Sequence, residues 1–297
     1  MNIHPMTNMI LRFQGTSKCS RSFFISLAVF FSIINLSFAQ DLYGLENSTK
    51  YANYLMLSEQ YKLAAEEYER LVFLDSANIG FKSKLVQAYR NSGNFSLALD
   101  RVNRFSNGNI LSLPKSLAQE YLSTLLLINS SREIDFFLKN NKSIDQYHKN
   151  IFNWSNLIIS GEYTKAQKEI QFFAGKKDKL YPEMQYITKY ALSQKHKSSF
   201  LAGSLSTIVP GLGKVYTENY LDGVISLLFI AGTAWQSYRG FNKSGINSVS
   251  GWIFGGISFG FYLGNIYGSS KSAKRFNKLK IDDTNKKVYS FIQSNSF

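Results

Sequence analysis

A pattern of apolar residues that returns after 34 positions constrains the fold of this chain more than any other feature. Ala64 in "YKLAAEEYERL" and Ala98 in "NFSLALDRV" are 34 positions apart, and the same shift takes Leu55 to Tyr89. The apolar residues between them recur at helical spacing, small where two helices would cross closely and large beside the crossing. Such a period predicts helix pairs that stack and bury their apolar faces against one another.

A third copy of the pattern contains Trp154 and Ala166, the latter two full periods after Ala98. The stretch between the second and third copies has Arg132 in place of the small residue, which predicts a degenerate pair. The pattern resembles the tetratricopeptide repeat, whose period is about 34 residues, although Ser76 stands where that family often has proline. The resemblance implies helical repeats over residues 40–195 that bind a protein or peptide on a concave face. An irregular helical bundle with accidental spacing is the alternative.

The repeat pattern assigns two groups of residues. The first is expected to pack within and between the helix pairs, with glycine at the tight turns: Ala52, Leu55, Ala64, Tyr68, Tyr89, Gly93, Ala98, Trp154, Gly161 and Ala166. The second would line the concave face and contact a partner, or would be ordinary solvated positions: Asn53, Asn91, Asn94, Asn153 and Asn156.

Charged residues are absent from three stretches of the C-terminal third, residues 198–213, 223–238 and 244–270. As helices the first two would be about 24 Å long, shorter than a hydrocarbon core of roughly 30 Å, whereas the third is long enough to cross it. We therefore expect residues 198–276 to form a membrane domain, followed by a basic tail over residues 277–297.

Glycines recur at every fourth position in the third stretch, at Gly256, Gly260, Gly264 and Gly268. Glycine weakens an exposed helix in water by about 1 kcal/mol, but in lipid it lets a second helix approach closely. We expect this stripe to pack against the second stretch near Gly223, which gives an all-α fold of helical repeats followed by a glycine-rich transmembrane hairpin. A homo-oligomer formed through the glycine face is the alternative.

A helix must break at "VPGLGK", because Pro210 cannot continue it and Gly211 and Gly213 permit unusual backbone angles. We expect a turn at the membrane interface that follows a short or re-entrant helix. The arrangement resembles the Pro-Gly-x-Gly membrane domains that follow tetratricopeptide repeats in bacterial envelope proteins, with Lys214 in place of a polar Gln or His. The resemblance covers about residues 200–276 and implies an architecture but no reaction.

Residues 1–39 have the pattern of a secretory signal peptide, with basic residues before an apolar run and a Ser-Phe-Ala cleavage site at 37–39. An uncleaved signal anchor is the alternative. A signal peptide would place the protein in the bacterial inner membrane with its repeats in the periplasm. Two membrane crossings, which we favour, would leave the basic tail outside, whereas three would bring it into the cytoplasm as the positive-inside tendency favours.

The net charge of +14 is spread along the chain and is densest beside apolar segments, which favours a membrane surface over nucleic acid. With one cysteine and no catalytic, phosphate-binding or metal-binding motif, the sequence predicts neither an enzyme nor a cofactor or metal. The predicted function is a membrane-anchored protein–protein interaction scaffold of the bacterial cell envelope, in contact with lipid and a protein or peptide. The alternative is a subunit of an oligomeric membrane transport or secretion assembly.

Overall fold

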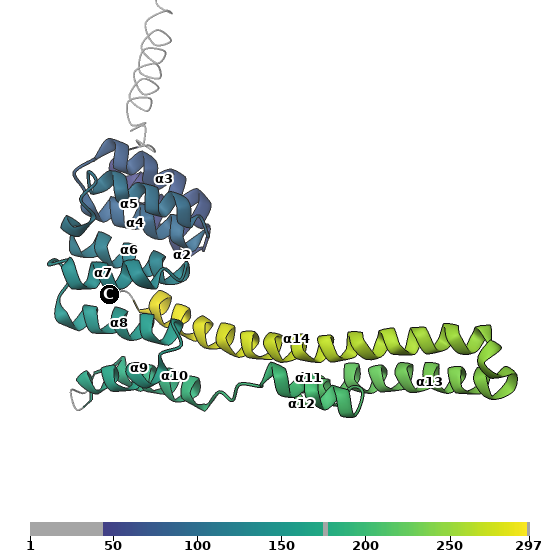
Figure 1. The fold of residues 1–297 in the computed structure, drawn as a ribbon. Coiled ribbons are helices and arrows are strands. Elements are labelled where there is room, and N and C mark those ends of the chain that lie inside the picture. The colour runs from purple at the N-terminus through teal and green to yellow at the C-terminus, as the bar shows by residue number, and fades with distance from the viewer. Residues whose placement is uncertain (1–43, 175–177, 296–297) are drawn as a thin grey trace, which may run out of the picture.

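The computed structural model describes residues 44–174 and 178–295, which form helices and their connections without a strand (Figure 1). The all-α prediction is therefore confirmed for the described residues. The predicted signal peptide of residues 1–39 lies outside them. The helices are arranged in two parts, a stack of short helices and a long helical arm that extends from one end of the stack.

The stack consists of helix pairs in which each helix packs on its partner, and the first helices of the later pairs also contact one another in succession. A single helix and two short 3-10 turns complete it. The pairs are α2 (Leu45–Leu57) with α3 (Tyr61–Leu74), α4 (Ile79–Asn91) with α5 (Phe95–Phe105), α6 (Lys115–Leu127) with α7 (Ser131–Asn140), and α8 (Gln146–Ile159) with α9 (Tyr163–Glu169), followed by α10 (Tyr181–Ser193), with η1 (Ile110–Ser112) and η2 (Ile170–Phe172) in the connections.

The turn inside each of these pairs contains one residue with a positive φ angle. These residues are Glu59, Gly93, Asn129 and Gly161, with φ of 59°, 80°, 58° and 78°. The interval from Gly93 to Asn129 is two positions longer than the 34-residue period, and the interval from Asn129 to Gly161 is two positions shorter. Ile134 therefore replaces Arg132 as the counterpart of Ala98. Ile134 is fully buried, and the pair predicted to be degenerate is a complete pair shifted by two positions.

Most of the residues predicted to pack in the repeats lie in the core. Ala52, Leu55, Ala64, Tyr68, Ala98, Trp154 and Ala166 are buried, Tyr89 is partly buried against the core, and Gly93 and Gly161 occupy the turns. Trp154 joins two helices of the stack, because its indole Nε1 donates to Thr188 Oγ1 on α10 at 2.9 Å.

Asp145 caps the N-terminus of α8 and fixes where that helix begins. Its Oδ1 accepts from the backbone N–H of His148 at 3.0 Å, and its Oδ2 accepts from Lys115 Nζ on α6 at 2.6 Å. Partial burial raises the pKa of Asp145, but the hydrogen bonds from Lys115 and His148 outweigh this effect and leave the pKa below its usual range. The cap therefore ties two neighbouring pairs together as well as starting a helix.

The arm, which we define as residues 198–276, contains three helices and the first part of a fourth. They are α11 (Ser199–Ile208), α12 (Leu212–Tyr216) and α13 (Tyr220–Ser244), and after the turn η3 (Gly245–Asn247) the chain returns in α14 (Val249–Ser294). A helical hairpin of α13 and α14 is thus present where it was predicted (Figure 1). In the described ranges, however, no helix combines the length and the apolarity that a membrane crossing requires, so the transmembrane character predicted for the hairpin is unsupported.

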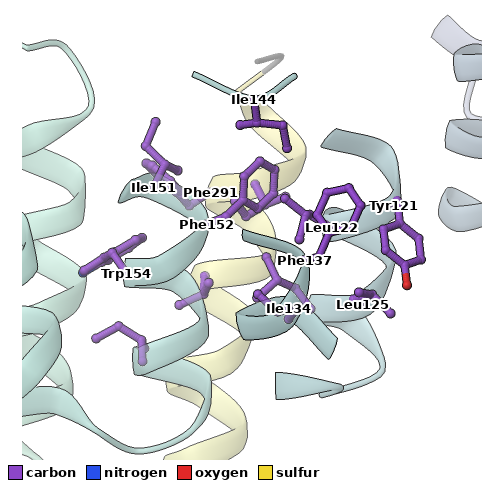
Figure 2. Close-up of a cluster of buried hydrophobic side chains, with 14 of the residues drawn as sticks. Tyr121, Leu122, Leu125, Ile134, Phe137, Ile144, Ile151, Phe152, Trp154 and Phe291 are labelled. Atoms are coloured by element: carbon purple, nitrogen blue, oxygen red, sulfur yellow. The ribbon is translucent and has the colours of Figure 1, made fainter. Parts of the chain in front are cut away.

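The segment expected to be a basic tail continues α14 as far as Ser294 and reaches the core of the stack. Val288, Phe291 and Ile292 are buried among α6, α8 and α10. The ring of Phe291 meets that of Trp154 edge to face, with centroids 5.3 Å apart. Figure 2 shows Phe291 among the buried side chains of the stack. A helix from the C-terminal end of the chain therefore completes the repeat core.

Candidate functional site

The first helices of the later pairs, α4, α6 and α8, contact one another in succession and form one face of the stack, which we call the inner face. The end of α14 packs on α6 and α8 and occupies part of this face. Beside it, a cavity of about 260 Å³ lies between α4, α6 and the last turn of α14. The inner face thus retains one recess that is not filled by the chain's own helix.

Residues of α4 reach this cavity because they recur at intervals of three and four along one side of the helix. Asn78 caps the helix, with its Oδ1 accepting from the N–H of Phe81 at 3.2 Å. The side chains that line the cavity from α4 and α6 are mostly polar: Ser83, Lys84, Gln87, Arg90, Ser116, Gln119, Glu120 and Ser123.

Arg90 and Glu120 form an ion pair in the wall of the cavity, with Nε and Oε2 3.0 Å apart. Arg90 is only 4% exposed. Burial raises the pKa of Glu120, and the guanidinium of Arg90 acts against this increase. Lys84 adds a second positive charge to the same wall, so the lining has more cationic than anionic groups.

Two buried hydrogen-bond donors in this wall, Arg90 Nη1 and Gln119 Nε2, have no partner. Gln119 is 6% exposed. A buried donor without an acceptor costs about 1–3 kcal/mol, so a ligand that brings carbonyl or carboxylate oxygens would recover part of this cost. Arg90, Gln119 and Glu120 were not among the predicted site residues. The available signal was polar residues at helical spacing on the first helices of the pairs.

The five asparagines predicted to contact a partner are not gathered at this cavity. Asn53 accepts from Tyr68 Oη at 2.8 Å, and Asn94 donates to Ser92 Oγ within its own turn. Asn156 is buried and donates to Asp135 Oδ1 at 2.7 Å. Asn91 Oδ1 is buried without a partner, and Asn153 borders a different hollow, between α7 and α8. Asn53 and Asn156 thus serve the packing of the stack.

The glycines of the "VPGLGK" turn and Gly223 do come together. Gly211 has a φ of +89°, and a Cβ there would lie 2.1 Å from the carbonyl oxygen of Gly223. A Cβ on Gly213 would lie 1.8 Å from the carbonyl oxygen of Ala202 on α11. After Pro210, therefore, α12 folds back along α11 at a distance that only glycine allows.

The glycine stripe at every fourth position of α14 does not form the seam of the hairpin. A Cβ at Gly256, Gly260 or Gly264 would meet nothing within 4 Å, and one at Gly268 would meet only the side chain of Lys214, at 3.6 Å. The residues buried in the seam are instead seven apart: Gly223, Ile230 and Ser237 on α13, and Gly251, Ser258 and Asn265 on α14. A seven-residue repeat is the spacing at which two helices stay in contact along their length.

Hydrogen bonds from serine hydroxyls hold this seam together. Ser237 Oγ donates to the carbonyl oxygen of Gly251 at 2.8 Å, and Ser258 Oγ donates to that of Ile230 at 3.1 Å. Ser206 on α11 bonds to Ser269 on α14 at 2.7 Å. Apart from Ile230, the residues buried along the arm are accordingly small or polar.

The surface of the arm is apolar, which reverses the distribution found in the stack. Leu221 and Leu228 of α13 are 78% and 66% exposed, and Phe259 of α14 is 62% exposed. Large apolar side chains are exposed on α11, α13 and α14: Phe200, Ile208, Leu221, Val224, Ile225, Leu228, Phe229, Ile253, Phe259, Phe261 and Leu263.

Among the described residues, no three His, Cys, Asp or Glu side chains lie together as the ligands of a metal ion would. Comparison of the chain with protein-family models, with curated proteins and with solved structures gives no match.

Proposed function

We propose that the protein is a scaffold anchored to a bacterial envelope membrane, in which the arm lies in lipid and the helix pairs bind a protein or peptide partner. The strongest support is the distribution of side chains in the arm, where the buried residues are mostly small or polar and most Leu, Ile and Phe side chains are exposed. Helices that associate in lipid are packed through small residues and interhelical hydrogen bonds, since apolar side chains gain nothing by leaving the acyl chains.

Aromatic residues of the arm are placed as they would be at two lipid–water interfaces. Tyr220 and Trp235 stand near opposite ends of the apolar part of α13, as Trp252 and Tyr267 do on α14, and all of them are exposed. The two members of each pair are about four helical turns, or about 23 Å, apart, somewhat less than a hydrocarbon core of roughly 30 Å. Tyrosine and tryptophan are enriched at such interfaces, so the two pairs would mark the borders of the part in lipid.

Both ends of the arm lie beside the stack, because the chain leaves it after α10 and returns to it in α14 (Figure 1). An arm that enters and leaves the membrane on the same side crosses it an even number of times, which supports two crossings. Helices α11 and α12 would then form a re-entrant segment, which enters the membrane and leaves it on the same side, since α11 runs along α14 and α12 folds back beside α11. We place the stack in the periplasm and the arm in the inner membrane, as the predicted leader implies.

The partner would bind at the inner-face cavity through acceptor oxygens, because Arg90 Nη1 and Gln119 Nε2 are unsatisfied there. Peptides selected from a random library on the full chain are expected to carry acidic residues or a free C-terminus. Binding of the selected peptides should fall at least tenfold in an Arg90→Met, Gln119→Leu variant. Equal binding by this variant would place the partner site elsewhere.

Flotation of the full chain with liposomes tests the membrane location. A variant with Leu228→Glu and Phe259→Glu places two charges on the arm surface, and the matched control places the same charges on the stack at Leu57→Glu and Phe73→Glu, both of which replace residues that are 86% exposed. Burying a charge in hydrocarbon is costly, so the arm variant should lose most of its association and the control should keep it. A full chain that stays monodisperse in buffer without detergent or lipid would contradict the proposal.

A further inference from the structure

A groove of about 360 Å³ runs along the arm between α13 and α14, and α12 closes the end nearer to the stack. It begins at Lys214 and Asn265 and continues between the aromatic side chains of Phe229 and Phe261. Gly260 and Gly264 form part of its wall, and because a Cβ at either position would meet nothing within 4 Å, the absent side chains leave the groove open.

The end of the groove near the stack is polar and lacks a negative charge. Lys214 Nζ donates to Ser226 Oγ at 2.8 Å. The nearest acidic residues along the chain have other partners, since Glu218 pairs with Lys197 and Asp222 accepts from the side chain of Asn219. Among the described residues, therefore, the ammonium of Lys214 is matched by a hydroxyl and by no carboxylate.

Asn265 gives a second and independent indication of a ligand. Its side chain is 5% exposed, and neither its Nδ2 nor its Oδ1 has a hydrogen-bond partner. Ser258, the preceding residue of the same seam, bonds across to α13, whereas the amide of Asn265 makes no such bond. A buried amide needs both a donor and an acceptor, so a ligand that fits this position would supply an acceptor for Nδ2 and a hydroxyl for Oδ1.

The rest of the groove suits an acyl chain. The rings of Phe229 and Phe261 are 5.8 Å apart on the two helices, and Ile225 and Ile230 add aliphatic walls. A ligand that matches the whole groove is therefore an amphiphile, with a negative and hydroxyl-bearing head at Lys214 and an apolar chain toward the tip of the arm. The exposed cations Lys271, Lys274 and Arg275 follow on α14 just beyond this end, and they would add to the attraction for a negative headgroup.

We propose that this groove binds a phospholipid with a net-negative headgroup, with its phosphate at Lys214 and Asn265 and one acyl chain between Phe229 and Phe261. This inference rests on the proposed membrane location of the arm. In that setting the polar end would lie just inside the interface marked by Tyr220 and Tyr267, where a lysine side chain can reach a headgroup.

The test measures lipid binding by the full chain in a nonionic detergent, by native mass spectrometry and by the shift in Tm on adding lipid. Phosphatidylglycerol and phosphatidylcholine with the same acyl chains are the two probes. Wild type is expected to bind phosphatidylglycerol at least tenfold more tightly. Lys214→Gln and Asn265→Leu should each reduce this preference to twofold or less, whereas Lys243→Gln, which removes the same charge at the exposed tip of the arm, should retain it.

Asn265→Leu also separates a lipid site from damage to the fold. Leucine removes the unsatisfied amide, so this variant without lipid should have a Tm at least equal to that of wild type and yet gain nothing from phosphatidylglycerol. Equal affinity of wild type for the two lipids, or a preference that survives in both groove variants, would overturn the inference. The inference would also be overturned if the wild-type chain were a dimer without lipid and Asn265→Leu made it a monomer, because a second copy of the chain would then occupy the groove.

Flotation distinguishes a failure of this site from a failure of the proposed function. A chain that floats with phosphatidylcholine vesicles but does not prefer phosphatidylglycerol in detergent would overturn the lipid site alone. A chain that floats with neither lipid would overturn both the lipid site and the membrane location.

Discussion

Replacing Phe291 with alanine tests whether the end of α14 is part of the repeat core. The side chain of Phe291 is fully buried, and its ring contacts that of Trp154 with centroids 5.3 Å apart and planes at 74°. Removing a buried phenylalanine typically costs about 3–5 kcal/mol, of which an edge-to-face pair accounts for about 0.5–1.5 kcal/mol. Domains of this kind are stable by only about 5–15 kcal/mol in total, so the loss should be a large fraction of the stability of the stack.

Unfolding by urea can be followed through Trp154 fluorescence after the other two tryptophans, Trp235 and Trp252, are replaced by phenylalanine. The matched control is Leu279→Ala, which removes an apolar side chain that is 59% exposed on the same helix and should change the stability by less than about 0.5 kcal/mol. If Phe291→Ala costs no more than this control, α14 does not complete the core and the reasoning fails.

Three further comparisons test the packing at single positions. Gly213→Ala should destabilise the arm, because its Cβ would lie 1.8 Å from a backbone oxygen of α11. Gly256→Ala, whose Cβ would meet nothing, should be neutral or stabilising by up to about 1 kcal/mol. Thermal unfolding in detergent compares the two variants. Ile134→Ala should cost about 2–5 kcal/mol and Arg132→Ala less than about 0.5 kcal/mol in urea unfolding, and the reverse order would refute the two-residue shift of the third pair. Folding lowers the pKa of Asp145, so the stability that its carboxylate contributes is present above the ordinary pKa of about 3.9 and is lost as the pH falls below that value. Wild type should therefore lose more stability than Asp145→Asn between pH 5 and pH 2.5. Equal losses would show that the carboxylate is not stabilised in the fold.

The helix pairs were predictable because local pattern and long-range packing agree in them. A small residue at a helix crossing, such as Ala64 or Ala98, is both a feature of the sequence and the contact that sets the distance between two helices. The third pair escaped this reasoning because counting by 34 assumes connections of constant length. A shift of two positions moves the crossing position from Arg132 to Ile134, and a large apolar residue can occupy it without changing the arrangement of the pair.

The seam of the arm was predicted less well, because glycine spacing was taken to indicate close approach. Close approach in fact occurs at Gly211, Gly213, Gly223 and Gly240, each of which lies against the backbone of another segment. In the seam between α13 and α14, Gly240 meets the backbone of Gly251, and the buried residues otherwise follow a seven-residue repeat of mostly small, hydroxyl and amide side chains. Serine and asparagine are ordinary on a soluble helix, so only the pairing of the two helices reveals that Ser258 and Asn265 face inward.

The course of α14 explains why its end was expected to be a tail. Its buried residues are seven apart at Gly251, Ser258 and Asn265, and three to four apart farther along the helix, at Ser269 and Ala273 and again at Thr284, Val288 and Phe291. The first spacing matches one neighbouring helix, whereas the second matches a helix that is covered by several others. The charges between these two parts lie where the helix passes from the arm to the stack, so they conceal the short apolar stripe that follows. Because one unbroken helix of 46 residues packs on α13 in the arm and on α6, α8 and α10 in the stack, a rotation of the arm relative to the stack would have to bend α14 or break the contacts of Phe291.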